Sequence, residues 1–279
     1  MIVDFHTHIL PESFAQERER LRRLDRTFAA LFPNDKARLA STAMLLQSME
    51  KWGIDRAIAL GYGWTDPGVA RESNDYLLDA ARTSGGRIVP FCSVDPTLGD
   101  EAVREVERCA LAGAHGIGEL HPDSQRFDVA DRAVLAPVME VAARLHLVVL
   151  THASEPLGHT YPGKGTVWPS RLAGLASNFP GVKFVFAHWG GGLPFYMLMP
   201  ELNRDLTNVW FDSAATPLLY RESVYSAAAE SAGAGRLLFG SDYPLINQGR
   251  AMDGVRAAGL DSETQRAVLG ENALALLDL

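Results

Sequence analysis

Two histidines stand one residue apart in an apolar segment near the start of the sequence. The segment Ile2–Pro11 has the sequence IVDFHTHILP and carries His6 and His8. Residues i and i+2 of a strand point to the same face, with Cβ atoms roughly 6.5–7 Å apart. Two imidazoles at that spacing can close on one ion, because metal–nitrogen bonds are about 2.0–2.1 Å long. The pair therefore indicates a metal site on one strand face.

Further histidines and carboxylates end other apolar segments of the chain. The ends of the predicted strands four, five, six and eight carry Glu119 and His121, His152, His188, and Asp242. In a barrel of parallel strands these ends meet at one mouth, where active sites lie. His152 and Asp242 would complete the strand-one site and leave one position free for water.

Each of these residues also has an ordinary structural explanation. Buried histidines are often only hydrogen-bonded, and Asp242 in GSDYP suits a simple turn. His188 could pack before the glycines that follow it, and Glu119 could pair with Arg126. Ligand-type residues at the same end of five strands nevertheless favour the metal interpretation over coincidence.

These side chains need a frame that brings separate strands to one mouth. Short apolar segments without clean alternation recur along the chain, as is typical of parallel strands buried on both faces. Eight of them alternate with helix-like stretches, which predicts an α/β fold of the (β/α)8 TIM barrel type. A doubly wound sheet is the alternative, but no glycine-rich phosphate loop follows the first strand. The predicted strands are Ile2–His6, Arg56–Tyr62, Ile88–Val94, His115–Leu120, Leu147–Ala153, Lys183–Trp189, Val209–Ala214 and Leu237–Asp242.

One charged, irregular segment, Leu10 to about Ala40, interrupts this alternation. It follows the first strand, where the first loop at the mouth belongs, so we predict an inserted helical segment over the barrel mouth. No internal repeat or linker divides the chain, and its 279 residues suit one barrel. We therefore predict a single domain over residues 1–279.

A polar loop rich in glycine and proline follows the fifth predicted strand. This loop, Ser154–Trp168, has the sequence SEPLGHTYPGKGTVW. Loop residues beside a catalytic strand end often contact substrate, so His159, Tyr161 and Lys164 are candidate substrate-binding residues. His121, at the end of the fourth predicted strand, joins this group.

Composition restricts the partners and the compartment. A net charge of −8 and a pI near 5.5 disfavour nucleic acid or an anionic membrane as partner. The sequence has neither an apolar run of transmembrane length nor a signal-peptide pattern, and its two cysteines suit a reduced compartment. We expect a cytoplasmic protein that acts on a small-molecule substrate, and homo-oligomer formation stays open.

The motifs DFHTH, LTHASEP, AHWGGGLPF and LLFGSDYP resemble those of the amidohydrolase superfamily. They span most of the chain and are most similar to the branch that contains aminocarboxymuconate-semialdehyde decarboxylase. The resemblance implies a (β/α)8 barrel with a divalent metal ion, usually zinc, and makes His6, His8 and His152 ligands. It further implies that Asp242 binds the metal and moves a proton of bound water. His188 would hydrogen-bond that water or polarise the substrate.

The fourth predicted strand departs from the pattern of many two-metal members, which carry a lysine there that becomes carbamylated. This chain has GIGELHP instead, which resembles metal-dependent nucleases of the TatD type. In those proteins the carboxylate can bridge two metals. The resemblance then makes Glu119 a ligand, with His152 and His188 holding a second ion. The alternative is that Glu119 does not bind the metal and instead contacts a metal-binding residue or the substrate. We favour Glu119 at the metal centre and leave the count at one or two ions.

The predicted chemistry begins with water on the metal. A divalent ion lowers the pKa of bound water to about 7. Asp242 would accept its proton during attack on a carbonyl or ester carbon, and the metal or His188 would stabilise the oxyanion. The leading prediction is a hydrolase for a small amide, ester or lactone. The alternative is a non-oxidative carboxy-lyase for an unsaturated or aromatic acid. A non-catalytic barrel and a nuclease are disfavoured, because no ligand is missing and no basic stripe flanks the motifs.

Overall fold

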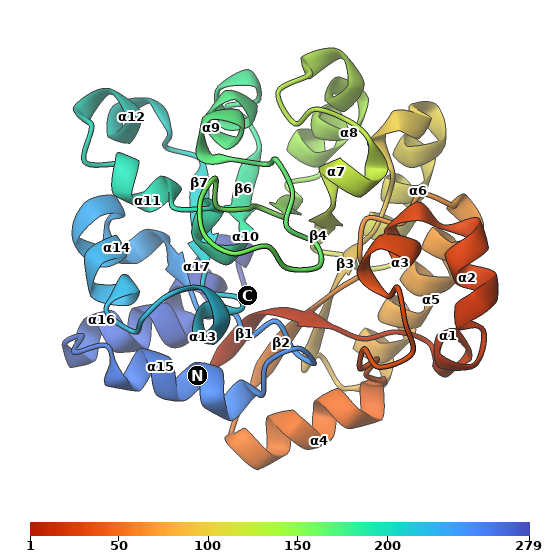
Figure 1. The fold of residues 1–279 in the computed structure, drawn as a ribbon, viewed down its shortest axis with the longest axis horizontal. Coiled ribbons are helices and arrows are strands. Elements are labelled where there is room, and N and C mark those ends of the chain that lie inside the picture. The colour runs from red at the N-terminus through yellow and green to blue at the C-terminus, as the bar shows by residue number, and fades with distance from the viewer.

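Eight parallel strands pair in chain order, from β1 to β8, and helices surround them (Figure 1). This arrangement is seen in the computed structural model, which describes residues 1–279. The predicted (β/α)8 barrel is confirmed. The strands are β1 (Val3–His8), β2 (Arg56–Leu60), β3 (Ile88–Cys92), β4 (Gly116–Leu120), β5 (Val148–Thr151), β6 (Lys183–Phe186), β7 (Val209–Asp212) and β8 (Leu237–Leu238).

Backbone hydrogen bonds join β1 to the segment that follows β8. Phe5 N donates to Phe239 O at 2.7 Å, and Asp242 N donates to His6 O at 2.9 Å. β8 itself has only two residues, so the predicted strand Leu237–Asp242 is longer than the observed one. Its remaining residues still run beside β1, and this seam places Asp242 next to the first histidine.

Helices connect the strands, and side-chain caps mark where several of them begin. Asp66, Asp131 and Asn247 accept hydrogen bonds from backbone N–H groups in the first turns of α5, α8 and α15. Such caps satisfy donors that have no partner within the helix.

None of the helices combines the length and the apolar character that a membrane crossing needs. The α-helices are α1 (Glu12–Gln16), α2 (Arg18–Leu24), α3 (Arg26–Leu31), α4 (Thr42–Trp52), α5 (Pro67–Thr83), α6 (Asp100–Leu111), α7 (Pro122–Gln125), α8 (Arg132–Arg144), α9 (Pro169–Asn178), α10 (Ala187–Gly190), α11 (Leu193–Tyr196), α12 (Pro200–Asp205), α13 (Thr216–Leu219), α14 (Val224–Ala232), α15 (Gln248–Ala257), α16 (Ser262–Arg266) and α17 (Asn272–Leu277). Two 3-10 helices, η1 (Pro96–Leu98) and η2 (Ala234–Arg236), and one π-helix, η3 (Ala267–Glu271), complete the set.

Alternate strand residues belong to two separate apolar cores. Ala57 and Val149 pack with helix residues between the strands and the outer helices. Ile58 and Leu150 pack with residues of other strands and of α17. Because side chains alternate along a strand, the second core fills the barrel interior. Both faces of each strand are therefore buried, which explains the continuous apolar segments of the sequence.

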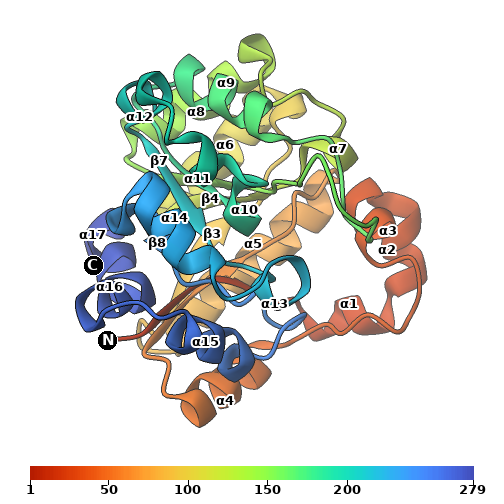
Figure 2. The same ribbon diagram turned by 60° about the vertical axis from the view of Figure 1, so that its left-hand side comes forward.

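The inserted segment after β1 forms helices α1 to α3, which stand at one side of the barrel mouth (Figure 2). Phe14, Phe28 and Phe32 pack there with Trp64, which follows β2. The loop after β5 extends across to α3 in the same view. A Cβ atom at Gly163 of this loop would lie 3.3 Å from Leu31 Cδ2 of α3. The predicted helical insertion over the mouth is thus confirmed, and the β5 loop meets it.

Candidate metal centre and active site

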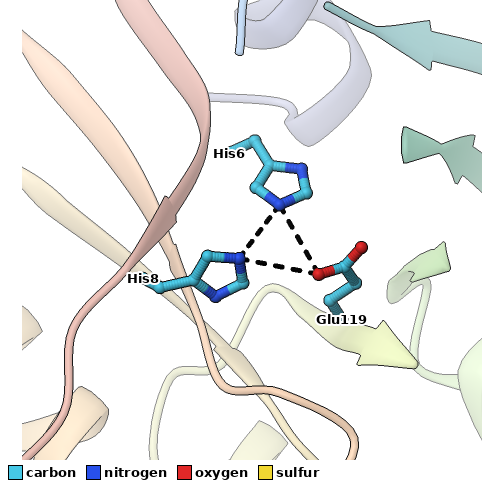
Figure 3. A group of neighbouring side chains, drawn as sticks. All are labelled: His6, His8 and Glu119. Atoms are coloured by element: carbon cyan, nitrogen blue, oxygen red, sulfur yellow. Dashed lines mark hydrogen bonds and ion pairs between the residues drawn. The ribbon is translucent and has the colours of Figure 1, made fainter. Parts of the chain in front are cut away.

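His6 and His8 point the same ring atom toward one position at the mouth end of β1 (Figure 3). Their Nε2 atoms lie 3.0 Å apart. The Oε2 atom of Glu119, from β4, lies 3.6 Å from His6 Nε2 and 3.5 Å from His8 Nε2. All three side chains are buried, and two imidazole nitrogens and one carboxylate oxygen converge on one position. This is a donor set that divalent transition metals accept.

Asp242 adds a second carboxylate to this group. Its Oδ1 atom lies 3.9 Å from His6 Nε2 and 3.6 Å from His8 Nε2. The residue has a φ of 65°, in the left-handed region that non-glycine residues rarely adopt. Such conformations cluster at functional sites, where surrounding contacts impose them. Here the backbone hydrogen bond to His6 O holds Asp242 in that position.

Hydrogen bonds behind the two histidines fix the orientation of each ring. His6 Nδ1 lies 2.9 Å from Asp212 Oδ2, and His8 Nδ1 lies 3.3 Å from the carbonyl oxygen of Leu60. Partners of this kind leave Nε2 free to bind a metal ion. Asp212 is the last residue of β7, and the sequence analysis did not single it out. Its position at the end of a strand could have identified it as a candidate site residue.

The other oxygen of Glu119 faces a second pair of histidines. Glu119 Oε1 lies 3.0 Å from His152 Nδ1 and 3.7 Å from His188 Nε2. His188 follows β6 with a φ of 53°, and its backbone N–H donates to Asp212 Oδ1 at 3.1 Å. The predicted sixth strand therefore ends earlier than expected, at Phe186, because the chain turns sharply at His188. These three side chains form a second group with ligand atoms close enough for one ion.

Opposite charges packed around Glu119 shift the pKa values of its neighbours. Burial lowers the pKa of His6, but the carboxylates of Asp212 and Glu119 outweigh burial and hold it well above its usual value. Burial and the charge of His6 hold the pKa of His8 well below its usual value. Burial raises the pKa of Glu119, yet His121 and His6 keep it well below the usual range. The carboxylate therefore stays ionised and favours a cation beside it.

The second group shows the same competition between burial and charge. Burial lowers the pKa of His152 to about 4. Burial lowers the pKa of His188, but the nearby carboxylates of Glu119 and Asp242 outweigh burial and raise it to about 9. Burial raises the pKa of Asp242 despite the nearby His6 and His188. A divalent cation would replace protons on these histidines, because metal ligands must be deprotonated. The residues present therefore fit a metal ion.

Of the four predicted substrate-binding residues, two line a cavity beside the donor groups and two do not. His121 lies against Glu119, with Nε2 3.0 Å from Oε2. His121 and Lys164 line one cavity of about 240 Å³, together with His152. His159 is exposed, and Tyr161 donates its hydroxyl hydrogen to Glu155 at 2.9 Å. The structure thus brings His121 and Lys164 together, while His159 and Tyr161 do not line this cavity.

Tyr62 is a further residue at this site that the sequence analysis did not identify. It lies two residues beyond β2, and its ring stacks on His8 with centroids 3.9 Å apart and planes 12° apart. The available signal was an aromatic residue at the end of the second predicted strand. Nothing in the sequence alone pairs it with His8.

Comparison with known proteins identifies the family. A family model described as Amidohydrolase matches residues 3–279. The chain belongs to the amidohydrolase family. The superfamily resemblance noted in the sequence is therefore confirmed, and the family is one of enzymes.

Curated relatives of this amidohydrolase family member carry decarboxylase names. A 2-amino-3-carboxymuconate-6-semialdehyde decarboxylase from Dictyostelium discoideum is 21% identical over 99% of this chain and 91% of its own length. A gamma-resorcylate decarboxylase from Polaromonas sp. strain JS666 is 26% identical over 72% of this chain and 73% of its own length. Among solved structures, a dihydroxybenzoic acid decarboxylase from Polaromonas sp. JS666 has a TM-score of 0.75 and 19% identity. That match covers 100% of this chain and 97% of the other, which is described with manganese and the inhibitor 2-nitroresorcinol.

Proposed function

We propose that this amidohydrolase family member is a metal-dependent carboxy-lyase that removes CO2 from a small unsaturated or aromatic carboxylic acid. The decarboxylase names of its curated relatives carry the proposal. They favour the alternative function of the sequence analysis over the hydrolase ranked first there. The small cavity beside the donor groups supports a small substrate, since ligand pockets usually enclose about 300–1,000 Å³.

We assign His6, His8 and Asp242 as ligands of the first ion, with Glu119 beside them. A divalent ion there would orient the acid and draw electron density from it. Glu119 Oε1, His152 and His188 would hold a second ion where one binds. Zinc and manganese both accept imidazole and carboxylate ligands. The sequence-based preference for zinc therefore stays open beside manganese, with which the solved Polaromonas relative is described.

Asp242 is suited to deliver the proton that decarboxylation requires. Its Oδ1 faces the two strand-one histidines, while Oδ2 has no hydrogen-bond partner in the protein. The proton moves from Oδ2 to the substrate carbon that bears the carboxylate. The bond to the carboxylate then breaks, CO2 leaves, the electron pair stays on the carbon skeleton, and solvent returns a proton to Asp242.

Lys164 and His121 are assigned to substrate binding at the cavity wall. Lys164 Nζ donates to the carbonyl oxygens of Leu157 and His159, at 2.5 and 3.0 Å. Those bonds use two of its three N–H groups and leave the third for an anionic substrate. The backbone oxygen of His159 helps to hold Lys164 in place, and no role in substrate binding is assigned to the side chains of His159 and Tyr161.

A substrate panel tests the proposal. The protein is loaded with zinc or manganese and incubated with gamma-resorcylate, salicylate and aminocarboxymuconate semialdehyde. The expected result is release of CO2 and of the matching decarboxylated product, both lost in His8→Ala. Lack of CO2 release from all acids, together with hydrolysis of lactone or ester substrates, would overturn the carboxy-lyase assignment and restore the hydrolase.

A further inference from the structure

The ring of Tyr62 is held between a proposed metal ligand and an apolar cluster. One face stacks on His8. Phe32 lies 5.3 Å away and Trp64 lies 5.4 Å away, both nearly edge-on to the Tyr62 ring. Phe32 and Trp64 belong to the core that anchors the inserted helices. The ring position is therefore fixed by packing, and the side chain has little rotational freedom.

The hydroxyl of Tyr62 makes no hydrogen bond to the protein, although the neighbouring polar groups are well paired. The side chain is only half-buried, whereas His8 beneath it is 2% exposed. A tyrosine phenol has an ordinary pKa of about 10, so the hydroxyl keeps its proton at neutral pH. It is a donor near the proposed metal centre that the protein itself leaves without an acceptor.

Tyr62 and the substrate cavity share one neighbour, His121. The Tyr62 ring centroid is 5.9 Å from that of His121, which lines the cavity. A tyrosine with one apolar side and one polar atom usually finds a partner for its hydroxyl when it is removed from water. Bound substrate would exclude water from this corner. A phenol donor there requires an acceptor on the substrate.

We propose that Tyr62 determines specificity for acids by donating a hydrogen bond from its hydroxyl to a carboxylate oxygen of the substrate. This inference rests on the proposed function, because it takes the substrate to be a carboxylic acid. The ring and the hydroxyl have separate roles. The ring orients His8, and the hydroxyl distinguishes an acid from the same molecule without its carboxylate.

Two substitutions separate these roles. Tyr62→Phe keeps the stacked ring and removes only the oxygen, whereas Tyr62→Leu removes both. Tyr225→Phe is the matched control, because the Tyr225 hydroxyl also lacks a partner but is fully buried in α14. Dissociation constants are measured by calorimetry in an Asp242→Asn background, in which turnover is strongly slowed. The two probes are gamma-resorcylate and resorcinol, which differ by the carboxylate alone, and metal content is measured in every variant.

The expected result for Tyr62→Phe is binding of gamma-resorcylate weakened about 10-fold or more, as for a hydrogen bond to a charged group. Binding of resorcinol should change less than about 2-fold, metal content should stay the same, and Tyr225→Phe should match the parent. Tyr62→Leu should in addition lose metal. Equal weakening for both probes, loss of metal in Tyr62→Phe, or absence of any acid binding would each overturn the proposal. Acid binding without CO2 release in the wild type would instead overturn the proposed function and leave the Tyr62 test intact.

Discussion

The carboxylate of Asp212 acts on the proposed metal centre through His6. It accepts from His6 Nδ1 and from the backbone N–H of His188, so one side chain orients both residues. It is completely buried and faces Nδ1 of His6, whereas Nε2 of the same ring faces His8 and Glu119. Asp212 is therefore a positioning residue rather than a ligand.

Asp212→Asn should weaken metal binding about 10–100-fold, as loss of an outer partner of a ligating histidine typically does. The amide keeps the size of the side chain but can present an N–H group to His6, which disturbs the tautomer that directs Nε2 to the metal. Competition with a chelator of known affinity measures the effect. Asp205→Asn, at an exposed position of α12, is the control. Unchanged metal affinity in Asp212→Asn would remove this role.

Asp242→Asn should lower turnover about 10²–10⁴-fold, the range that proton transfer by a positioned side chain contributes. The amide retains a coordinating oxygen, so metal content should fall only in part, and substrate binding should change far less. Single-turnover kinetics and thermal melting are measured on one preparation. If the variant melts early but reacts at the wild-type rate, Asp242 serves only the turn before Pro244.

Residue types at strand ends made most of the candidate site predictable. Parallel strands bring their carboxyl ends together, so His6, Glu119 and His152 could be grouped without coordinates. Tyr62 could not be found in this way, because its stack on His8 depends on the register between β1 and β2. That register shifts between Asp4 and Thr7, an irregularity that the sequence pattern does not show.

At the scale of elements, the β5 loop is tied to α7 at the edge of the mouth. Asp123 accepts from the backbone N–H of Thr166 at 2.9 Å and from its hydroxyl at 2.8 Å. Gly165 N donates to Ser154 Oγ at 2.9 Å and closes the base of the loop. The strand-like and helix-like segments of the sequence predicted the barrel, but the polar loop has no periodicity that would predict its path.

Asp123→Ala should release this loop while the barrel stays folded. We expect faster hydrogen exchange over residues 155–166 and a KM raised several-fold, since Lys164 would no longer be held at the cavity. Asp128→Ala is the control, because Asp128 caps only its own turn. Asp123 also lines the cavity, so Thr166→Val provides a variant that loosens the same tie without touching the cavity. Unchanged exchange in both variants would contradict the anchoring role.

At the scale of the whole molecule, removal of metal should lower stability. An ion present at 100 times its dissociation constant stabilises the folded state by about 2.7 kcal/mol. For 279 residues, with an unfolding entropy of about 2.1 cal/mol/K per residue, that corresponds to a melting temperature higher by roughly 5 °C. Melting is measured after dialysis against a chelator and again after metal is restored. His6→Ala should not respond to added metal, and a wild-type protein that melts at one temperature in both states would argue against a resident ion.

The seam between β1 and the segment after β8 sets an order of events during synthesis. Asp4 and Ser241, which hydrogen-bond across this seam, stand 237 residues apart in the chain. At about 5–20 residues per second, the ribosome adds the later segment some tens of seconds after the earlier one. Until then His6 and His8 lack Asp242 beside them, and one edge of β1 lacks its backbone partner. A nascent chain stalled before residue 242 should therefore have one edge of its first strand unpaired and should bind metal weakly, so activity becomes available only after the last segment of the barrel has been synthesised.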